Sequence, residues 1–228
     1  MNILFEDNHI IAVNKSTSDL VQGDKTGDIP LDARLKEYLK EKYTKQGNVF
    51  VGVAHRIDRP VSGVVLFAKT SKALARLNKM LSKGELKKAY WAIVKNKPGN
   101  ESGILHHYLL RNEKQNKSYC YDSPVANTKE AFLEYRLIAK SEMYYLLEID
   151  LKTGRHHQIR AQMAAMGCPI RGDLKYGYPR SNQNGGISLH ARQIEFVHPV
   201  RNEPVTITAP VPAGDKLWQF FESTLASR

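Results

Sequence analysis

The amino-acid sequence predicts an α+β protein with a mixed, mostly antiparallel sheet flanked by helices. Segments with strand patterns outnumber segments with helical spacing, and the two kinds do not alternate as they do in a doubly wound parallel sheet. A chain of 228 residues is long enough to bury a sizeable core. No internal repeat or low-complexity linker interrupts the chain, so we expect residues 1–228 to form a single domain.

The chain begins with a predicted hairpin and a helix. Two apolar runs, 3–5 and 10–13, flank a polar turn, which is typical of a hairpin. Glycine and proline then mark a loop at 16–30, and apolar residues recur at helical spacing from 31 to 39. We therefore expect a long loop that leads into an amphipathic helix.

The next segment, VAHRIDRPVSGVVLFAKT at 53–70, ends in an apolar run that predicts a buried strand. In SKALARLNKMLSKG, which follows, the leucines share one helical face and the basic residues share the other. This pattern predicts a helix over 71–83, with Ser71 as the N-cap and Gly84 as the stop signal.

The rest of the chain is predicted to be mainly strand. AYWAIVKN and MYYLLEIDL have strand patterns, and the second runs through a tight Thr-Gly turn into a helix that ends before Gly167. ISLHARQIEFVHP and PVTITAP predict closing strands, and DKLWQFFEST predicts a final short helix. No element is assigned to residues 97–142.

The chain is strongly basic, with 34 Lys and Arg against 23 Asp and Glu and a net charge of +11. Such a balance favours polyanionic partners such as nucleic acid. Nine basic residues and one acidic residue, Glu85, lie between Lys69 and Lys97. This local excess indicates either an RNA-binding face or a solvated helix face.

The cysteines and the start of the chain indicate a cytoplasmic protein. Cys120 and Cys168 are too few for a disulfide framework and have no CxxC spacing, which is typical of a reducing cytosol. The first residues carry no targeting signal, and no segment approaches the roughly 18 apolar residues that a membrane helix requires. We expect no membrane partner.

Asp58 is the most informative polar residue, because it lies between Arg56 and Arg59 beside an apolar strand. The local sequence favours an ion pair at a turn. The alternative is a fixed, ionised carboxylate, which nucleophilic catalysis at a sugar carbon or an electrophilic base carbon requires. Arg155 and Arg160, at the start of a predicted helix, are either surface residues or groups that bind phosphate or anchor a carboxylate from another segment.

Other kinds of site find little support. The adjacent histidines at 106–107 and 156–157 share no face, so we expect no metal site. The chain has no GxGxxG, GxxxxGK[ST] or GxSxG motif, and we expect no cofactor. Tyr90 and Trp91 point to opposite faces of a predicted strand, which allows one to stack on a base while the other packs in the core.

Three longer motifs occur in order along the chain: HRIDRPVSGVVLFAK from His55, KKAYWAIV from Lys87, and LKTGRHHQIRAQMAAMGCPIRGDLKYG from Leu151. Together they resemble the RluA-type pseudouridine synthase family, whose motifs are HRLDRxTSG, KxYxAxV and LxTGRxHQIRxHLxxxGxPIxGDxxYG. The resemblance extends from the first hairpin to LHARQIEFVHP. It implies the pseudouridine synthase fold, with a bent and mostly antiparallel sheet.

The resemblance also implies a reaction. The enzyme would isomerise uridine in structured RNA, tRNA or rRNA, to pseudouridine by breaking the N1–C1′ bond and joining the sugar to C5. It would need no cofactor or metal, and the target uridine would be flipped out of the RNA. We expect no obligate protein partner and a monomer.

Residue roles follow from the same resemblance. Asp58 matches the nucleophile, which attacks C1′ or C6 or assists elimination, and Arg155 matches the residue that keeps it ionised. Tyr90 would stack on the target base near C5, and Arg56 would help to hold the displaced RNA. The other expected substrate-binding residues are His55, Arg59 and Arg160, together with Lys72, Arg76 and Lys79 for phosphate contacts.

The chain departs from the family pattern in three places. NKSTS replaces NKPxG after the first hairpin, Val61 replaces a threonine, and Gln162 replaces a common histidine. A hairpin that begins at residue 3 leaves no room for the S4-type RNA-binding domain of many relatives, so we expect the catalytic domain to recognise RNA by itself.

Two other classes of protein are considered. A non-catalytic RNA-binding or chaperone protein would share the basic face, but it has no need for Asp58, Tyr90 and Arg155 together. A glycosidase would need a second carboxylate across the bond. No acidic residue lies in a comparable motif context, and the sequence leaves open only the distant Asp173 in RGDLKYG.

Overall fold

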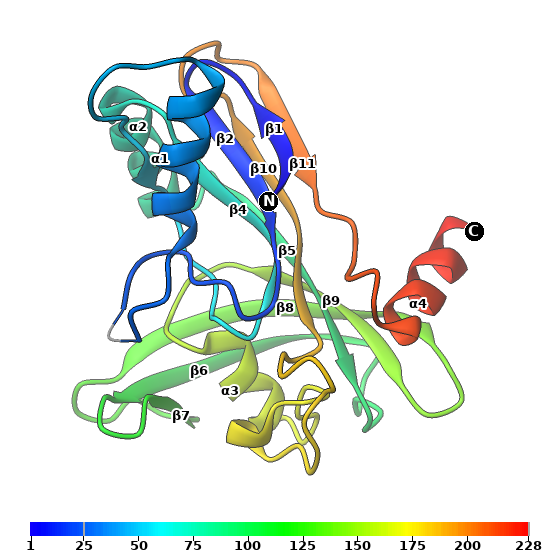
Figure 1. Cartoon of the computed structure of the whole chain (residues 1–228). Coiled ribbons are helices and arrows are strands. Elements are labelled where there is room, and N and C mark those ends of the chain that lie inside the picture. Colours follow the sequence, from blue (N-terminus) through cyan, green and yellow to red (C-terminus); the bar gives the residue numbers. More distant parts are fainter. Residues whose placement is uncertain (25, 228) are drawn as a thin grey trace. The chain divides into compact units, whose positions relative to one another are not determined.

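The computed structural model describes residues 1–24 and 26–227, and the chain divides into two compact units. Unit 1 comprises Met1–Leu86 and Ala191–Pro210, and unit 2 comprises Lys87–His190 and Val211–Arg228. Both units combine antiparallel strand pairings with helices (Figure 1), which confirms the α+β class. The single domain expected over 1–228 stays a prediction.

Unit 1 is a sheet with two helices. Its strands are β1 (Asn2–Glu6), β2 (Ile10–Lys15), β3 (Gly52–Val53), β4 (Ser62–Ala68), β10 (Leu189–Val197, from Ala191 on in this unit) and β11 (Pro204–Thr208). The order is β1-β2-β4-β10, with β3 on β4 and β11 on β10. The predicted N-terminal hairpin and closing strands are confirmed.

Strand β4 is the centre of unit 1, and every one of its residues is buried. Gly63 has a φ of 117°, and a Cβ at this position would lie 2.3 Å from the carbonyl oxygen of Ala191. A side chain at this position would collide with the backbone of β10. Glycine at position 63 therefore lets β4 and β10 approach closely.

Helices α1 (Leu31–Lys42) and α2 (Ser71–Ser82) complete unit 1. Helix α1 buries Leu31, Leu35 and Leu39 in a core shared with β2 and β4, as its spacing predicts. The expected cap of α2 is wrong by one residue: Thr70 is the N-cap, and its side chain accepts a hydrogen bond from the Ala73 amide.

A polar cluster ties helix α1 to the sheet of unit 1. The Glu6 carboxylate accepts hydrogen bonds from Lys42 and Lys69 at 2.8 Å and from the Tyr43 hydroxyl at 2.7 Å. Burial raises the pKa of Glu6, but these hydrogen bonds outweigh burial and lower the pKa to about 2. The carboxylate therefore stabilises the junction of β1, α1 and β4 in its ionised form.

Unit 2 is a five-stranded antiparallel sheet with helices. Its strands are β5 (Lys87–Val94), β6 (Ser102–Asn112), β7 (Lys117–Tyr121), β8 (Lys129–Lys140) and β9 (Tyr145–Leu151), in the order β5-β9-β8-β6-β7. Its helices are α3 (Gln158–Ala165), the short 3₁₀ helix η1 (Leu174–Tyr176) and α4 (Lys216–Ala226). Helix α3 contacts β6 and β7, and α4 contacts β8.

Sequence patterns assigned no element to 97–142, yet this range holds β6, β7 and β8. In β8, the buried side chains of Leu133 and Tyr135 alternate with the exposed side chains of Glu134 and Arg136. This alternation is the signal that identifies a half-exposed strand.

Strand alternation allows one aromatic side chain of β5 to be exposed, but both are buried. Tyr90 and Trp91 are both 7% exposed, and Trp91 packs with Trp218 and Phe221 of α4. From Tyr90 to Val94 every residue of β5 is buried, so period-two alternation does not separate an inner from an outer face over this part of the strand.

None of the helices in the described part of the chain has the length and apolarity that a bilayer crossing requires.

Candidate active site

The loop that precedes β4 carries four of the predicted site residues, His55, Arg56, Asp58 and Arg59. Asp58 is half-buried, and its carbonyl accepts a hydrogen bond from the Val61 amide at 3.0 Å, which closes a turn around it. The His55 Nε2 atom accepts a hydrogen bond from the Leu66 amide at 3.1 Å and so pins the loop to β4. The backbone on both sides of Asp58 is thus held in place.

A buried lysine that the sequence analysis did not single out also holds this loop. The Lys15 ammonium donates to the carbonyl oxygens of Ser16 and Arg59 at 2.9 Å and of Val61 at 2.7 Å, and Lys15 is 1% exposed. Burial lowers the pKa of Lys15 to about 8, and the negative charges of Asp19 and Asp58 oppose this shift. A lysine at the end of the apolar run IIAVNK is the signal that could have identified it.

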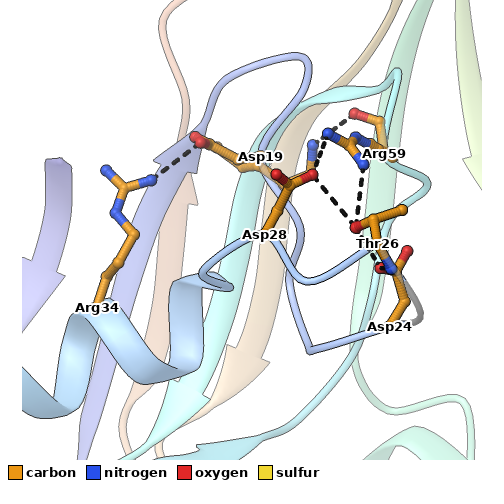
Figure 2. Close-up of polar contacts among 7 residues, drawn as sticks. Asp19, Asp24, Thr26, Asp28, Arg34 and Arg59 are labelled. Atoms are coloured by element: carbon orange, nitrogen blue, oxygen red, sulfur yellow. Dashed lines mark hydrogen bonds and ion pairs between the residues drawn. The ribbon is translucent and has the colours of Figure 1, made fainter.

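The two arginines beside Asp58 contact the loop that follows β2. Figure 2 shows Arg59, whose guanidinium lies 2.6 Å from the Asp28 carboxylate and 3.5 Å from the Thr26 hydroxyl. The Arg56 guanidinium donates to the Gln22 side chain at 3.5 Å. Both arginines are exposed, so an anionic group can approach either guanidinium from solvent.

Arg155 lies in the turn between β9 and α3, and the structure confirms the expected strand–turn–helix arrangement. Its side chain is exposed, and its Nε atom donates to the Glu130 carbonyl at 2.9 Å. Its backbone amide donates to the side chain of Gln158 at 3.0 Å. Hydrogen bonds within unit 2 therefore hold both the backbone and the guanidinium of Arg155.

Arg160 anchors a carboxylate from another segment, which is one of the roles that the sequence allows. Its guanidinium donates to both carboxylate oxygens of Asp173, at 2.7 and 2.9 Å, and the two side chains are 6% and 1% exposed. Because this pair is buried, it favours structural anchoring, and the substrate-binding role of Arg160 stays a prediction. Asp173 is also unsuited to act as the second carboxylate of a glycosidase.

A buried polar cluster surrounds this ion pair. The Tyr176 hydroxyl bonds to the amide and carbonyl of Ser118, at 2.9 and 3.1 Å, and lies 3.1 Å from His157 Nδ1. Burial lowers the pKa of His157 to about 2, and the nearby charge of Arg160 adds to the shift, so this imidazole is neutral. The cluster fastens α3 to β7 and η1.

Tyr90 lies in the middle of β5, opposite Ile149 of β9. The sheet therefore fixes its backbone position, as a base-contacting residue requires. The three phosphate-contact candidates, Lys72, Arg76 and Lys79, are all exposed on α2. The Arg76 guanidinium also donates to the Pro199 carbonyl.

In the described ranges, 1–24 and 26–227, no group of three or more His, Cys, Asp or Glu side chains has the arrangement to hold a metal ion. Unit 1 brings His55, Arg56, Asp58 and Arg59 together on one loop, and unit 2 carries Tyr90 and Arg155. Within unit 1, a carboxylate flanked by two exposed guanidinium groups is suited to nucleophilic chemistry on an anionic substrate.

The segment that contains the Asp58 loop and the Arg155 turn matches a known protein family. Residues 9–165 match the profile described as RNA pseudouridylate synthase. The chain belongs to this family of enzymes, which confirms the expected class.

Particular relatives support the assignment. The chain is 31% identical over 237 residues to a tRNA pseudouridine synthase C of Vibrio parahaemolyticus, covering 96% of this chain and 92% of that protein. It is 34% identical over 227 residues to a ribosomal large subunit pseudouridine synthase D of Xylella fastidiosa, covering 93% and 66%. The structure of human RNA pseudouridylate synthase domain containing 4 superposes with a TM-score of 0.81 at 20% identity, covering 96% and 92%, which confirms the fold.

Proposed function

We propose that this protein isomerises specific uridines of tRNA or rRNA to pseudouridine, with Asp58 as the nucleophile. The observation that supports this proposal most directly is that the loop carrying Asp58 is held rigidly. Its backbone is held by Lys15 through the carbonyls of Arg59 and Val61 and by His55 through β4. A carboxylate on a rigid loop loses little entropy when it meets a reacting carbon.

The reaction exchanges one glycosidic bond for another. The N1–C1′ bond breaks, the base turns, C5 bonds to C1′, and the proton on C5 leaves while N1 gains a proton. Asp58 attacks C1′ or C6, or assists elimination at the sugar, and all three routes need its ionised form.

Unit 2 contributes the other two groups in this proposal. Tyr90 stacks on the flipped base near C5, where its hydroxyl is suited to proton transfer. Arg155 supplies the positive charge that keeps the nucleophile ionised.

RNA recognition is proposed to rest on exposed basic groups. Arg56 and Arg59 lie beside the nucleophile, and Lys72 and Lys79 of α2 contact phosphates. One relative is named for tRNA and another for the large ribosomal subunit, which supports both classes of RNA as candidate substrates. A location in the cytosol is part of the same proposal.

The test is the variant Asp58→Asn, which keeps the shape of the side chain and removes the nucleophile. Pseudouridine is mapped by chemical labelling or mass spectrometry in total RNA from cells without the gene, complemented with wild type or variant. We expect the variant to bind RNA and to remain folded while the modified site is lost.

A matched control is Glu203→Gln, which makes the same change in charge at an exposed ion pair with Arg201 in unit 1. This control should restore the modification. Near-wild-type turnover of Asp58→Asn would refute the role of Asp58, and the absence of any site that depends on the gene would refute the activity.

A further inference from the structure

The side-chain amide of Gln158 sets the geometry of the turn that carries Arg155. Gln158 Oε1 accepts hydrogen bonds from the Arg155 backbone amide at 3.0 Å and from the Thr153 hydroxyl at 2.8 Å. Gln158 is 3% exposed, so water does not compete for these bonds. One amide oxygen thus joins both sides of the turn.

The other end of the same amide is fixed to the sheet. Gln158 Nε2 donates to the Phe132 carbonyl of β8 at 2.9 Å, and the Phe132 amide donates to Thr153 Oγ1 at 2.9 Å. The Arg155 Nε atom donates to the Glu130 carbonyl, also on β8, at 2.9 Å. A closed network of hydrogen bonds therefore fixes both the backbone and the side chain of Arg155 relative to strand β8.

A second buried glutamine on the same helix provides a contrast. Gln162 is fully buried, and its Nε2 donates to the Leu105 and Ala131 carbonyls at 3.0 and 3.2 Å. Like Gln158 it fastens α3 to the sheet, but Gln162 itself lies one helical turn further along α3 from Arg155. Anchoring of the helix and positioning of the arginine are thus carried by different side chains.

We propose that Gln158, together with Thr153, is a positioning residue for Arg155 in pseudouridine formation, an inference that rests on the proposed function. Gln158 does not touch the substrate. It fixes the backbone from which the guanidinium extends, and a displacement of about 1 Å in a catalytic group can cost roughly 100-fold in rate. Thr153 contributes by holding the acceptor oxygen of Gln158 in place.

The first experiment compares Gln158→Leu with Gln162→Leu, since both remove a buried amide from α3. Single-turnover pseudouridine formation, RNA affinity and thermal unfolding are measured for each variant. We expect both to unfold at lower temperature, and only Gln158→Leu to lower the rate of the chemical step, by roughly 10- to 100-fold. RNA affinity should stay within about twofold of wild type in both.

If Gln158→Leu fails to fold, Thr153→Val is the substitute, because it removes the hydroxyl that bonds to Gln158 with little change in shape. It should lower the rate in the same direction with unchanged RNA affinity. Equal rate losses in the Gln158 and Gln162 variants would overturn the proposal, because loosening of helix α3 would then explain the slower reaction in both variants.

The closing experiment combines Gln158→Leu with Arg155→Lys. If Gln158 acts through Arg155, the double variant is about as slow as Arg155→Lys alone. Rate losses that multiply would overturn the positioning role while the proposed function stands. A wild-type rate for Arg155→Lys and Arg155→Ala would instead refute the role of Arg155, and a wild-type enzyme without turnover would refute the function.

Discussion

Replacing Arg160 with methionine should destabilise unit 2 and leave phosphate contacts with RNA unchanged. The Arg160 guanidinium holds both oxygens of the Asp173 carboxylate, at 2.7 and 2.9 Å, and both side chains are buried. Methionine fills most of the same volume but leaves the carboxylate buried without its charge partner. The structure therefore predicts a loss of stability, whereas a phosphate-binding arginine would predict a loss of RNA affinity.

The size of the effect follows from the burial of the pair. Removing one partner of a buried ion pair costs about 3–5 kcal/mol. In a protein of this size each kcal/mol lowers the unfolding temperature by about 2–4 °C, so the variant should unfold roughly 6–20 °C lower. The double variant Arg160→Met with Asp173→Leu should recover much of this loss, because no unpaired charge remains in the core.

Urea unfolding followed by tryptophan fluorescence measures the stability change, since Trp218 is buried in the core of unit 2. RNA affinity over a range of salt concentrations measures the phosphate contacts. The reasoning is refuted if Arg160→Met is as stable as wild type and its salt slope falls by about 0.7–0.9, the change for one lost phosphate contact.

Three further predictions concern other parts of the chain. Glu6→Gln should lower the free energy of unfolding by roughly 2 kcal/mol, because it removes the carboxylate bound by two lysines. The pKa of Glu6 is lowered from 4.5 to about 2 in the folded state, so its contribution to stability is complete above pH 4.5 and is lost as the pH falls towards 2. The stabilities of wild type and variant should therefore converge as the pH falls towards 2. Parallel curves of stability against pH would contradict this. The double variant Lys72→Gln with Lys79→Gln should lower the salt slope of RNA binding by about 0.7–0.9 per lysine. An unchanged slope would show that this face of α2 does not contact RNA. Arg76→Gln should mainly lower the stability of the protein, because it removes the hydrogen bond to the Pro199 carbonyl. Burial raises the pKa of the Cys120 thiol to about 12, so iodoacetamide at pH 8 should alkylate it far more slowly in the folded than in the urea-unfolded protein, and equal rates would disprove its protection.

Local patterns predicted many of the elements correctly. The hairpin at the N-terminus, helices α1 and α2 and the closing strands follow from apolar periodicity, because each buries one face against its own unit. The cap of α2 was placed one residue late because Thr70 and Ser71 are both good caps, and only the backbone conformation decides between them. Strands β6, β7 and β8 were not predicted, although the alternation of apolar and polar residues in β8 is itself a local signal of a half-exposed strand.

The candidate site divides in the same way. Motifs in the sequence were enough to single out Asp58, Tyr90 and Arg155, because each lies inside a short run of residues that resembles a family motif. The groups that hold these loops were not found. Lys15 lies 44 residues before Arg59, and Gln158 lies 26 residues after Phe132.

The sequence by itself determined the class of fold, the family and the residues expected to do chemistry, because motif identity and periodicity are properties of short segments. Only the tertiary structure decided what those residues contact. It showed that Arg160 holds Asp173, that Arg59 contacts Asp28 and that Arg76 bonds to Pro199. Such partners come from segments distant in the chain, and their choice depends on burial and distance, which no local pattern records.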